Sequence, residues 1–204
     1  QKPNKFIDHD HKLMEFKYFF TRKLIFIKES DATVLLPGGF GTLDEGFENF
    51  TLFQTGKLLP RPIILLEPKN GNYWNTWIDW VKSVLVKNKL ISPNDVHLFQ
   101  LKHSSKEAYG AIHDFYRVYH SLVYFKELTI LRFTQPISEK LIERLNIEFE
   151  DIVVEGKIYS SAALLGEIHN YDKTLKMPRL IFNFDKQSFG RLNQMIRNIN
   201  EWVS

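Results

Sequence analysis

Short apolar runs alternate along the chain with longer segments in which apolar residues recur at helical spacing. Residues 32–36 and 62–66 are runs of this first kind, partly β-branched and free of charged residues. Such runs are typical of strands buried on both faces of a parallel sheet. The segments with helical spacing carry their apolar residues at Leu13, Phe16, Phe20, Leu24 and Ile27, and at Leu43, Phe47, Phe50 and Phe53. The pattern predicts a helix over residues 11–29 and a second helix beginning after Thr42.

The same alternation continues to about residue 119. A turn at residues 70–72 precedes a tryptophan-rich pattern that predicts a helix over residues 73–87. A short strand is expected near residues 97–101, and a helix over residues 105–119. Strands that alternate with helices indicate an α/β fold built on a parallel sheet.

Residues 120–204 have a different order of elements. Strands are expected over residues 128–133 and 179–184, a strand or a hairpin over residues 152–158, and helices over residues 138–149 and 188–203. Two helices that cover one small sheet resemble half of a ferredoxin-like unit. We therefore predict two regions: residues 1–119, part of a nucleotide-binding α/β domain, and residues 120–204, a small α+β appendage.

Composition excludes several classes of protein. The net charge of the 204 residues is only +3, and lysine and arginine are interleaved with acidic residues, so nucleic acid is not an expected partner. No stretch approaches the roughly 18 apolar residues of a membrane span. The chain has no cysteine, which excludes disulfides and thiolate metal sites and allows a reducing, cytoplasmic location. His9, Asp10 and His11 are interpreted as a solvated loop and not as a metal site. No cofactor is expected.

The candidate chemistry begins at a glycine-rich loop, Pro37-Gly38-Gly39-Phe40-Gly41-Thr42. It lies between a predicted buried strand and a predicted helix. Glycines there allow positive φ and leave room for a ligand, and the first amides of a helix are suited to phosphate. The alternative is a tight turn whose glycines serve only its conformation. The strand–loop–helix context favours phosphate binding, with the Thr42 hydroxyl as an additional donor at the helix cap.

Glu45 and Arg22 are candidate partners of this loop. Thr42 and Glu45 have the spacing of a capping box, which would by itself explain Glu45. A carboxylate one turn into the helix could also reach the sugar of a bound nucleotide. Apolar residues lie in nearly every direction around Arg22, so its helix is expected to be buried. Its guanidinium would then need an anion, either a carboxylate or a phosphate. The alternative is a structural ion pair, or a side chain whose stem extends to solvent.

Together, the Arg-Lys pair and the glycine-rich loop resemble the LONELY GUY family, long labelled "possible lysine decarboxylase". The family pattern is an Arg-Lys pair on a helix followed, about one strand later, by PGGxGTxxE. The resemblance covers roughly residues 3–101, and the matching segments are Tyr18-Phe19-Phe20-Thr21-Arg22-Lys23, Pro37-Gly38-Gly39-Phe40-Gly41-Thr42-Leu43-Asp44-Glu45 and Gln54-Thr55-Gly56-Lys57.

The resemblance implies a Rossmann-like fold with helices on both faces of the sheet, usually dimeric. It implies a phosphoribohydrolase that cleaves a nucleoside 5′-monophosphate, with a purine nucleotide expected, into free base and ribose 5-phosphate. Arg22 and Glu45 would be the catalytic pair, with Arg22 lowering the pKa of Glu45. The phosphate and substrate would be held by Lys23, Gly38, Gly39, Gly41 and Thr42. Lysine decarboxylation is not expected, because no feature marks a Schiff-base lysine.

The sequence also departs from the family pattern. Family members begin with an earlier strand and another glycine-rich loop, whereas this chain starts just before the Arg-Lys helix. We expect that the first half was lost or resides on another chain. Gly46 follows Glu45 where many relatives carry a larger residue, and close packing or ligand approach would explain it.

Two other functions stay open from the sequence. One is a binding module that uses the same loop for a nucleotide or another phosphate ligand without chemistry. The other is a structural or regulatory fragment whose appendage binds a partner.

Overall fold

The computed structural model describes residues 16–164 and 173–203 of the chain. The chain divides into two compact units, Gln1–Ser30 and Asp31–Ser204. In the first unit the structure describes one helix, α1 (Phe19–Lys28). Phe20, Leu24 and Phe26 of α1 are exposed, so the expectation of a helix buried on nearly every side is wrong. The His9-Asp10-His11 segment and Leu13 lie outside the described residues.

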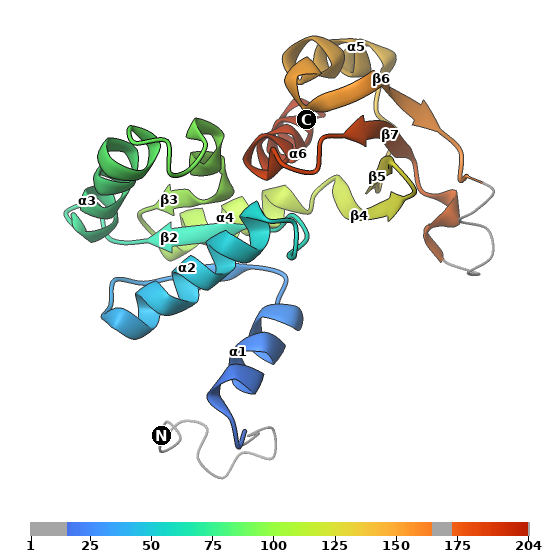
Figure 1. The fold of residues 1–204 in the computed structure, drawn as a ribbon. Helices are drawn as coiled ribbons and strands as arrows, with labels where there is room; N and C mark the ends of the chain where they lie inside the picture. Colours follow the sequence, from blue (N-terminus) through green and yellow to red (C-terminus); the bar gives the residue numbers. More distant parts are fainter. Residues whose placement is uncertain (1–15, 165–172, 204) are drawn as a thin grey trace. The chain divides into compact units, whose positions relative to one another are not determined.

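The second unit begins with a parallel three-stranded sheet (Figure 1). Its strands, in spatial order, are β1 (Thr33–Leu35), β2 (Ile63–Leu66) and β3 (Gln100–Lys102). Leu35 of β1 lies opposite Leu65 of β2, which lies opposite Leu101 of β3, so the three strands end at the same edge of the sheet. The predicted α/β architecture is confirmed. One detail is wrong: β1 is not buried on both faces, because Val34 is 41% exposed.

Helices connect and cover these strands. They are α2 (Phe40–Gln54), α3 (Tyr73–Trp80) with its π-helical continuation η1 (Val81–Val86), the 3₁₀ helix η2 (Pro93–Leu98) and α4 (Ser105–Phe115). The strand expected from residue 97 starts only at Gln100, because Ser92 and Asp95 form a capping box that begins η2. Helix α2 is followed by its C-cap Thr55 and then by Gly56, whose φ of +68° is easily adopted only by glycine.

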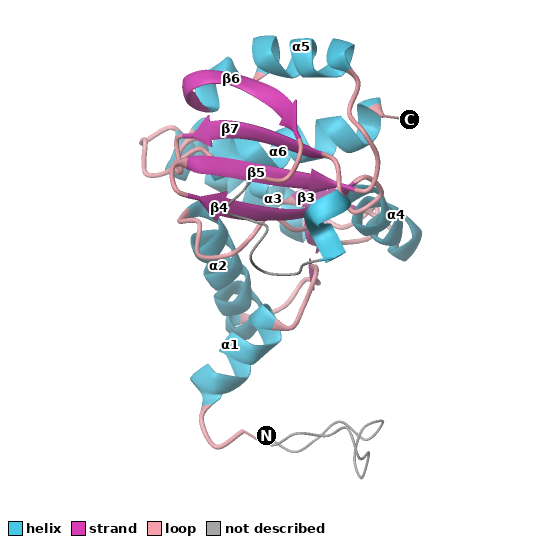
Figure 2. Ribbon diagram, turned by 90° about the vertical axis from the view of Figure 1, so that its right-hand side faces the viewer, coloured by secondary structure: helices cyan, strands magenta, loops and turns pink. Residues whose placement is uncertain are grey.

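The rest of the unit is an antiparallel sheet in the order β4-β5-β7-β6, with two covering helices (Figure 2). Its elements are β4 (Tyr119–Phe125), β5 (Leu128–Phe133), α5 (Glu139–Glu148), the 3₁₀ turn η3 (Glu150–Ile152), β6 (Val153–Ser161), the 3₁₀ turn η5 (Lys173–Lys176), β7 (Arg179–Phe184) and α6 (Phe189–Trp202). The bounds of β5 and β7 agree with those expected from the sequence. Strand β4 is not among the expected strands, and the helix expected to reach residue 119 ends at Phe115.

Helix α6 joins the two sheets. Asn200 of α6 donates to the carbonyl of Phe115 and accepts from the amides of Val118 and Tyr119, where the chain passes from α4 to β4. Gly190 packs so closely on η2 that an added Cβ would lie 2.0 Å from the carbonyl oxygen of Asn94. One continuous hydrophobic core therefore runs from Leu35 of β1 to Ile199 of α6. Within the two described ranges, no helix combines the length and apolarity needed to cross a membrane.

Candidate functional site

The glycine-rich loop follows β1 directly and leads into α2. Gly39 is the N-cap residue of α2, and its carbonyl accepts hydrogen bonds from the amides of Thr42 and Leu43. The amides of Gly39, Phe40 and Gly41 donate to no atom of the described residues. These amides lie at the carboxyl end of a parallel strand and at the positive end of the α2 dipole. The arrangement is suited to an anion.

The three loop glycines are present for different reasons. None of them has positive φ, because Gly56 and Gly156 are the glycines with positive φ in the described part of the chain. An added Cβ at Gly38 would lie 2.2 Å from the Thr42 hydroxyl oxygen, so Gly38 and Thr42 pack tightly together. At Gly39 and Gly41 an added Cβ would meet nothing within 4 Å. Neither positive φ nor a lack of space for a Cβ therefore explains why residues 39 and 41 are glycine.

Thr42 and Glu45 lie in α2, but not as a capping box. Because α2 begins at Phe40, Thr42 is its third residue and Glu45 its sixth, and no side chain caps the helix. The prediction of Thr42 as a cap is therefore wrong. The reason is that Gly39, which has no side chain, already supplies the carbonyl that starts the helix. Thr42 and Glu45 are three residues apart and so lie on the same side of α2.

A buried polar network holds α2 against β1 one turn after Glu45. The Asn49 side-chain oxygen accepts from Arg61 at 2.7 Å and from the Thr33 hydroxyl at 3.0 Å, and the Asn49 amide donates to the carbonyl of Glu45. Burial lowers the pKa of Arg61 from its ordinary value. Gly46 packs on β1 in the same region: its added Cβ would lie 3.1 Å from the Leu35 side chain. Close packing is therefore the reason for Gly46, and it keeps α2 near the strand.

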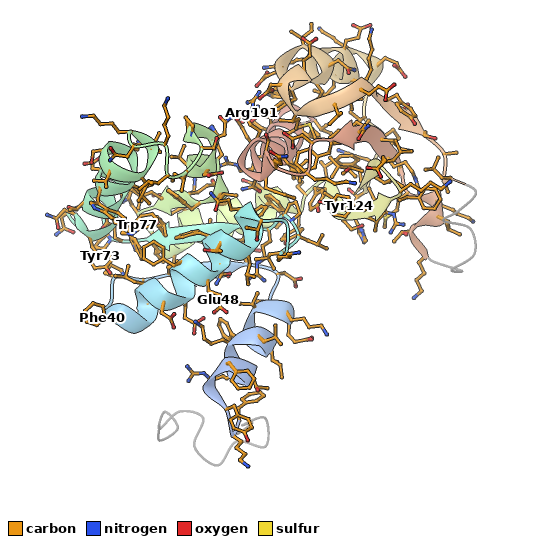
Figure 3. All side chains as sticks on the ribbon, in the orientation of Figure 1. Phe40, Glu48, Tyr73, Trp77, Tyr124 and Arg191 are labelled. Carbon is orange, nitrogen blue, oxygen red and sulfur yellow. The ribbon has the colours of Figure 1, made fainter. Side chains whose placement is uncertain are left out.

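The start of α3 contacts the loop through two aromatic residues. The Trp74 indole N–H donates to the Leu35 carbonyl at 3.1 Å, and the Tyr73 hydroxyl donates to the Gly38 carbonyl at 2.7 Å. Figure 3 places Tyr73 and Phe40 at the same end of the parallel sheet. The sequence pattern predicts neither contact. A buried tryptophan needs an acceptor for its N–H, so the sequence could predict that Trp74 has one. It does not identify which carbonyl accepts.

Arg22 and Lys23 are consecutive residues of α1 and belong to the first unit, whereas the loop and Glu45 belong to the second. The structure therefore brings together Gly38, Gly39, Gly41, Thr42 and Glu45. The pairing of Arg22 with Glu45 stays a prediction, as does the contact of Lys23 with a phosphate. Within residues 16–164 and 173–203, no group of three or more histidine, aspartate or glutamate side chains is arranged to hold a metal ion.

Comparisons with known proteins show which family the chain resembles. Residues 3–112 match the family model described as "Possible lysine decarboxylase", and this match contains α1, the glycine loop, Glu45 and the start of α3. Over 94 residues the chain is 34% identical to the cytokinin riboside 5′-monophosphate phosphoribohydrolase LOG1 of Arabidopsis thaliana, covering 46% of this chain and 42% of that protein. Over 99 residues it is 33% identical to the rice (Oryza sativa subsp. japonica) protein named "Probable cytokinin riboside 5′-monophosphate phosphoribohydrolase LOGL6". That match covers 46% of this chain and 38% of the rice protein. The chain thus spans less than half the length of these relatives.

Proposed function

Because the chain belongs to the LONELY GUY family, whose model matches more than half of it, we propose that its protein hydrolyses the N-glycosidic bond of a nucleoside 5′-monophosphate. Water is consumed, the bond between the base and C1′ breaks, and the products are the free base and ribose 5-phosphate. The observation that carries the proposal is the loop before α2, where three unengaged amides lie close in sequence to a carboxylate on the same helix.

The loop would bind the 5′-phosphate. Amides of Gly39, Phe40 and Gly41 offer donors without a basic side chain, and the α2 dipole adds favourable potential. The Thr42 hydroxyl, packed against Gly38, offers a further donor at the same end of the helix. Because nothing lies within 4 Å of the position of a Cβ on Gly39 or Gly41, a ligand can approach this backbone closely.

Glu45 would act on the sugar. Departure of the base leaves an oxocarbenium-like ribose, which a nearby carboxylate stabilises electrostatically while it orients the attacking water. Glu45 suits this role because it lies about one turn beyond the amides, on the side of α2 that carries Thr42. The bond from Asn49 to the Glu45 carbonyl holds this turn of the helix in place.

Arg22 and Lys23 would complete the site from α1. A guanidinium binds phosphate or ribose oxygens and favours the ionised form of a neighbouring carboxylate. This part of the proposal follows from the family motif, and Arg22→Ala tests it by its effect on turnover. A purine nucleotide is the proposed substrate class, and a homodimer the proposed assembly.

The decisive experiment is a product assay on the full-length protein with a panel of nucleoside monophosphates, monitoring ribose 5-phosphate and free base. We expect turnover with a purine nucleotide, and a loss of about 10²–10³-fold in Glu45→Gln, the range found when one electrostatic stabiliser of a transition state is removed. Asp44→Asn is the matched control, because Asp44 is an exposed carboxylate on the same turn. Absence of ribose 5-phosphate across the panel would reject the enzyme. Retained nucleotide binding would then favour the non-catalytic binding module.

A second comparison separates phosphate binding from a purely conformational loop. Gly41→Ala and Gly110→Ala both add a methyl group to a helical glycine whose surroundings are open. Both should keep or slightly raise the free energy of unfolding, since alanine favours helix by about 1 kcal/mol relative to glycine. Only Gly41→Ala should weaken binding of adenosine 5′-monophosphate. Equal binding by the two variants would contradict the proposed phosphate site.

A further inference from the structure

The loop before α2 is held in place by the helix that follows β2. Two consecutive residues at the start of α3 each donate one hydrogen bond to a backbone carbonyl of this loop. Trp74, which is 1% exposed, donates from its indole N–H to Leu35, at the end of β1. Tyr73 donates from its hydroxyl to Gly38, within the glycine run, at 2.7 Å. The two rings pack edge to face with their centroids 4.8 Å apart, so each helps to fix the other.

These bonds determine which way the loop amides point. In a trans peptide the carbonyl and the N–H lie on opposite sides of the chain. The Gly38 carbonyl is held by Tyr73, so the N–H of the same peptide, which belongs to Gly39, is directed away from Tyr73. The Gly39 carbonyl is held by the amides of Thr42 and Leu43, so the N–H of Phe40 is directed away from them. Both peptides that flank Gly39 therefore have an engaged carbonyl and an amide available to a ligand.

The start of α3, which carries Tyr73 and Trp74, is anchored to the sheet by a buried carboxylate. Glu67 follows β2 directly, is 1% exposed, and its amide donates to the carbonyl of Lys102 of β3. Its two carboxylate oxygens accept from the amides of Trp74 and Asn75 and from the Asn75 side chain, at 3.0–3.1 Å. A carboxylate bonded to the first amides of a helix fixes its position and complements its dipole. Gly71 leaves room for it, since an added Cβ would lie 3.0 Å from a Glu67 oxygen.

We propose that Tyr73 is a positioning residue for phosphate binding, and that Trp74 and Glu67 hold it in place. This inference rests on the proposed function. A Gly38–Gly39 peptide has no Cβ on either side to restrict its rotation, so without the Tyr73 hydroxyl it samples both orientations. A bound phosphate must then select the productive orientation, which reduces its apparent affinity. The hydroxyl preorganises the site without touching the ligand.

The test uses two tyrosines that make the same kind of bond. Tyr73→Phe removes only the hydroxyl that donates to Gly38. Tyr116→Phe is the matched control, because the Tyr116 hydroxyl also donates to a backbone carbonyl, that of Asp31, at 2.7 Å. Each variant is made in the full-length protein, and the dissociation constants of adenosine 5′-monophosphate and adenosine are measured in the Glu45→Gln background, in which turnover is slow. In the active protein, KM and kcat are measured separately.

We expect Tyr73→Phe to weaken adenosine 5′-monophosphate about tenfold, the value of one lost hydrogen bond, and to leave adenosine unchanged. KM should rise while kcat changes little. Tyr116→Phe should leave the dissociation constants of both ligands unchanged. Its thermal stability should fall about as much as that of Tyr73→Phe, because each variant loses one hydrogen bond. Equal weakening of both ligands by Tyr73→Phe, or no weakening of either, overturns the positioning role while the proposed function stands. A parent protein that binds no nucleotide overturns both.

Discussion

The two sheets of the second unit are stabilised in different ways. In the antiparallel sheet, β5 and β7 are buried along almost their whole length, and their apolar side chains pack on α5 and α6. The strands of the parallel sheet have three or four residues each, and Val34 of β1 is largely exposed.

In the parallel region, buried polar side chains compensate for the short strands and the smaller apolar contact. One such group is the network of Asn49, Arg61 and Thr33. Another is the Glu67 carboxylate, which accepts from the Trp74 amide at the start of α3. Both lie next to the ends of the parallel strands. Buried polar groups stabilise a fold less than an apolar core does, but they fix directions of hydrogen bonds. In the region with the candidate site, buried polar groups fix the orientation of the backbone. In the antiparallel region, the apolar core supplies most of the stability.

The largest effect is expected from breaking the apolar core of the antiparallel region. Leu145→Ala in α5 removes a fully buried side chain and should lower the free energy of unfolding by about 2–5 kcal/mol. Ile147→Ala on the same helix is the control: Ile147 is 81% exposed, and its loss should cost less than about 0.5 kcal/mol. Urea denaturation measures both. Similar losses in the two variants would contradict the assignment of stability to this core.

Breaking the polar network should have a smaller effect on stability and a local effect on structure. Asn49→Leu removes the oxygen that accepts from Arg61 and Thr33, and should cost about 1–3 kcal/mol because a buried donor loses its partner. Amide hydrogen exchange should accelerate in α2 more than in α5. If the two helices respond equally, the network is not specific to the parallel region.

The junction between the regions is tested by a glycine pair. Gly190→Ala places a methyl group against the backbone of Asn94, which overpacks the contact of α6 with η2 and should cost about 1–3 kcal/mol. Gly110→Ala in α4 meets nothing within 4 Å and should stabilise by about 0.5–1 kcal/mol. Opposite shifts of the urea midpoint are the expected result. Shifts of the same sign would show that α6 does not pack closely on η2.

The smallest effect is a pH dependence at the same junction. Burial lowers the pKa of His97, and the positive charges of Arg197 and Arg191 lower it further. Because the unfolded chain binds the proton more readily, the contribution of neutral His97 is complete above the ordinary pKa of about 6.5. It is lost as the pH falls from there through the folded pKa. His97→Gln should therefore flatten the fall of the urea midpoint between pH 7 and pH 5, and an unchanged slope would contradict this.

Local signals in the sequence specify only part of the candidate site. The strand, glycine loop and helix at residues 33–54 were predicted because apolar periodicity and glycine are local signals. The sequence predicts a start of α2 after Thr42, which is too late, because the Gly39 carbonyl and not a side chain begins the helix. Strand β4 was missed because it is defined by its pairing with β5, which a local pattern does not report.

The sequence by itself determined the α/β order, the family, and the residue types of the site, because each depends on spacing along one short stretch of chain. The tertiary structure alone decided that Tyr73 and Trp74 donate to Gly38 and Leu35, and that Glu67 anchors their helix. These bonds join residues that are 7 to 39 positions apart. Their geometry depends on how β1, β2 and α3 pack together, which no local sequence pattern specifies.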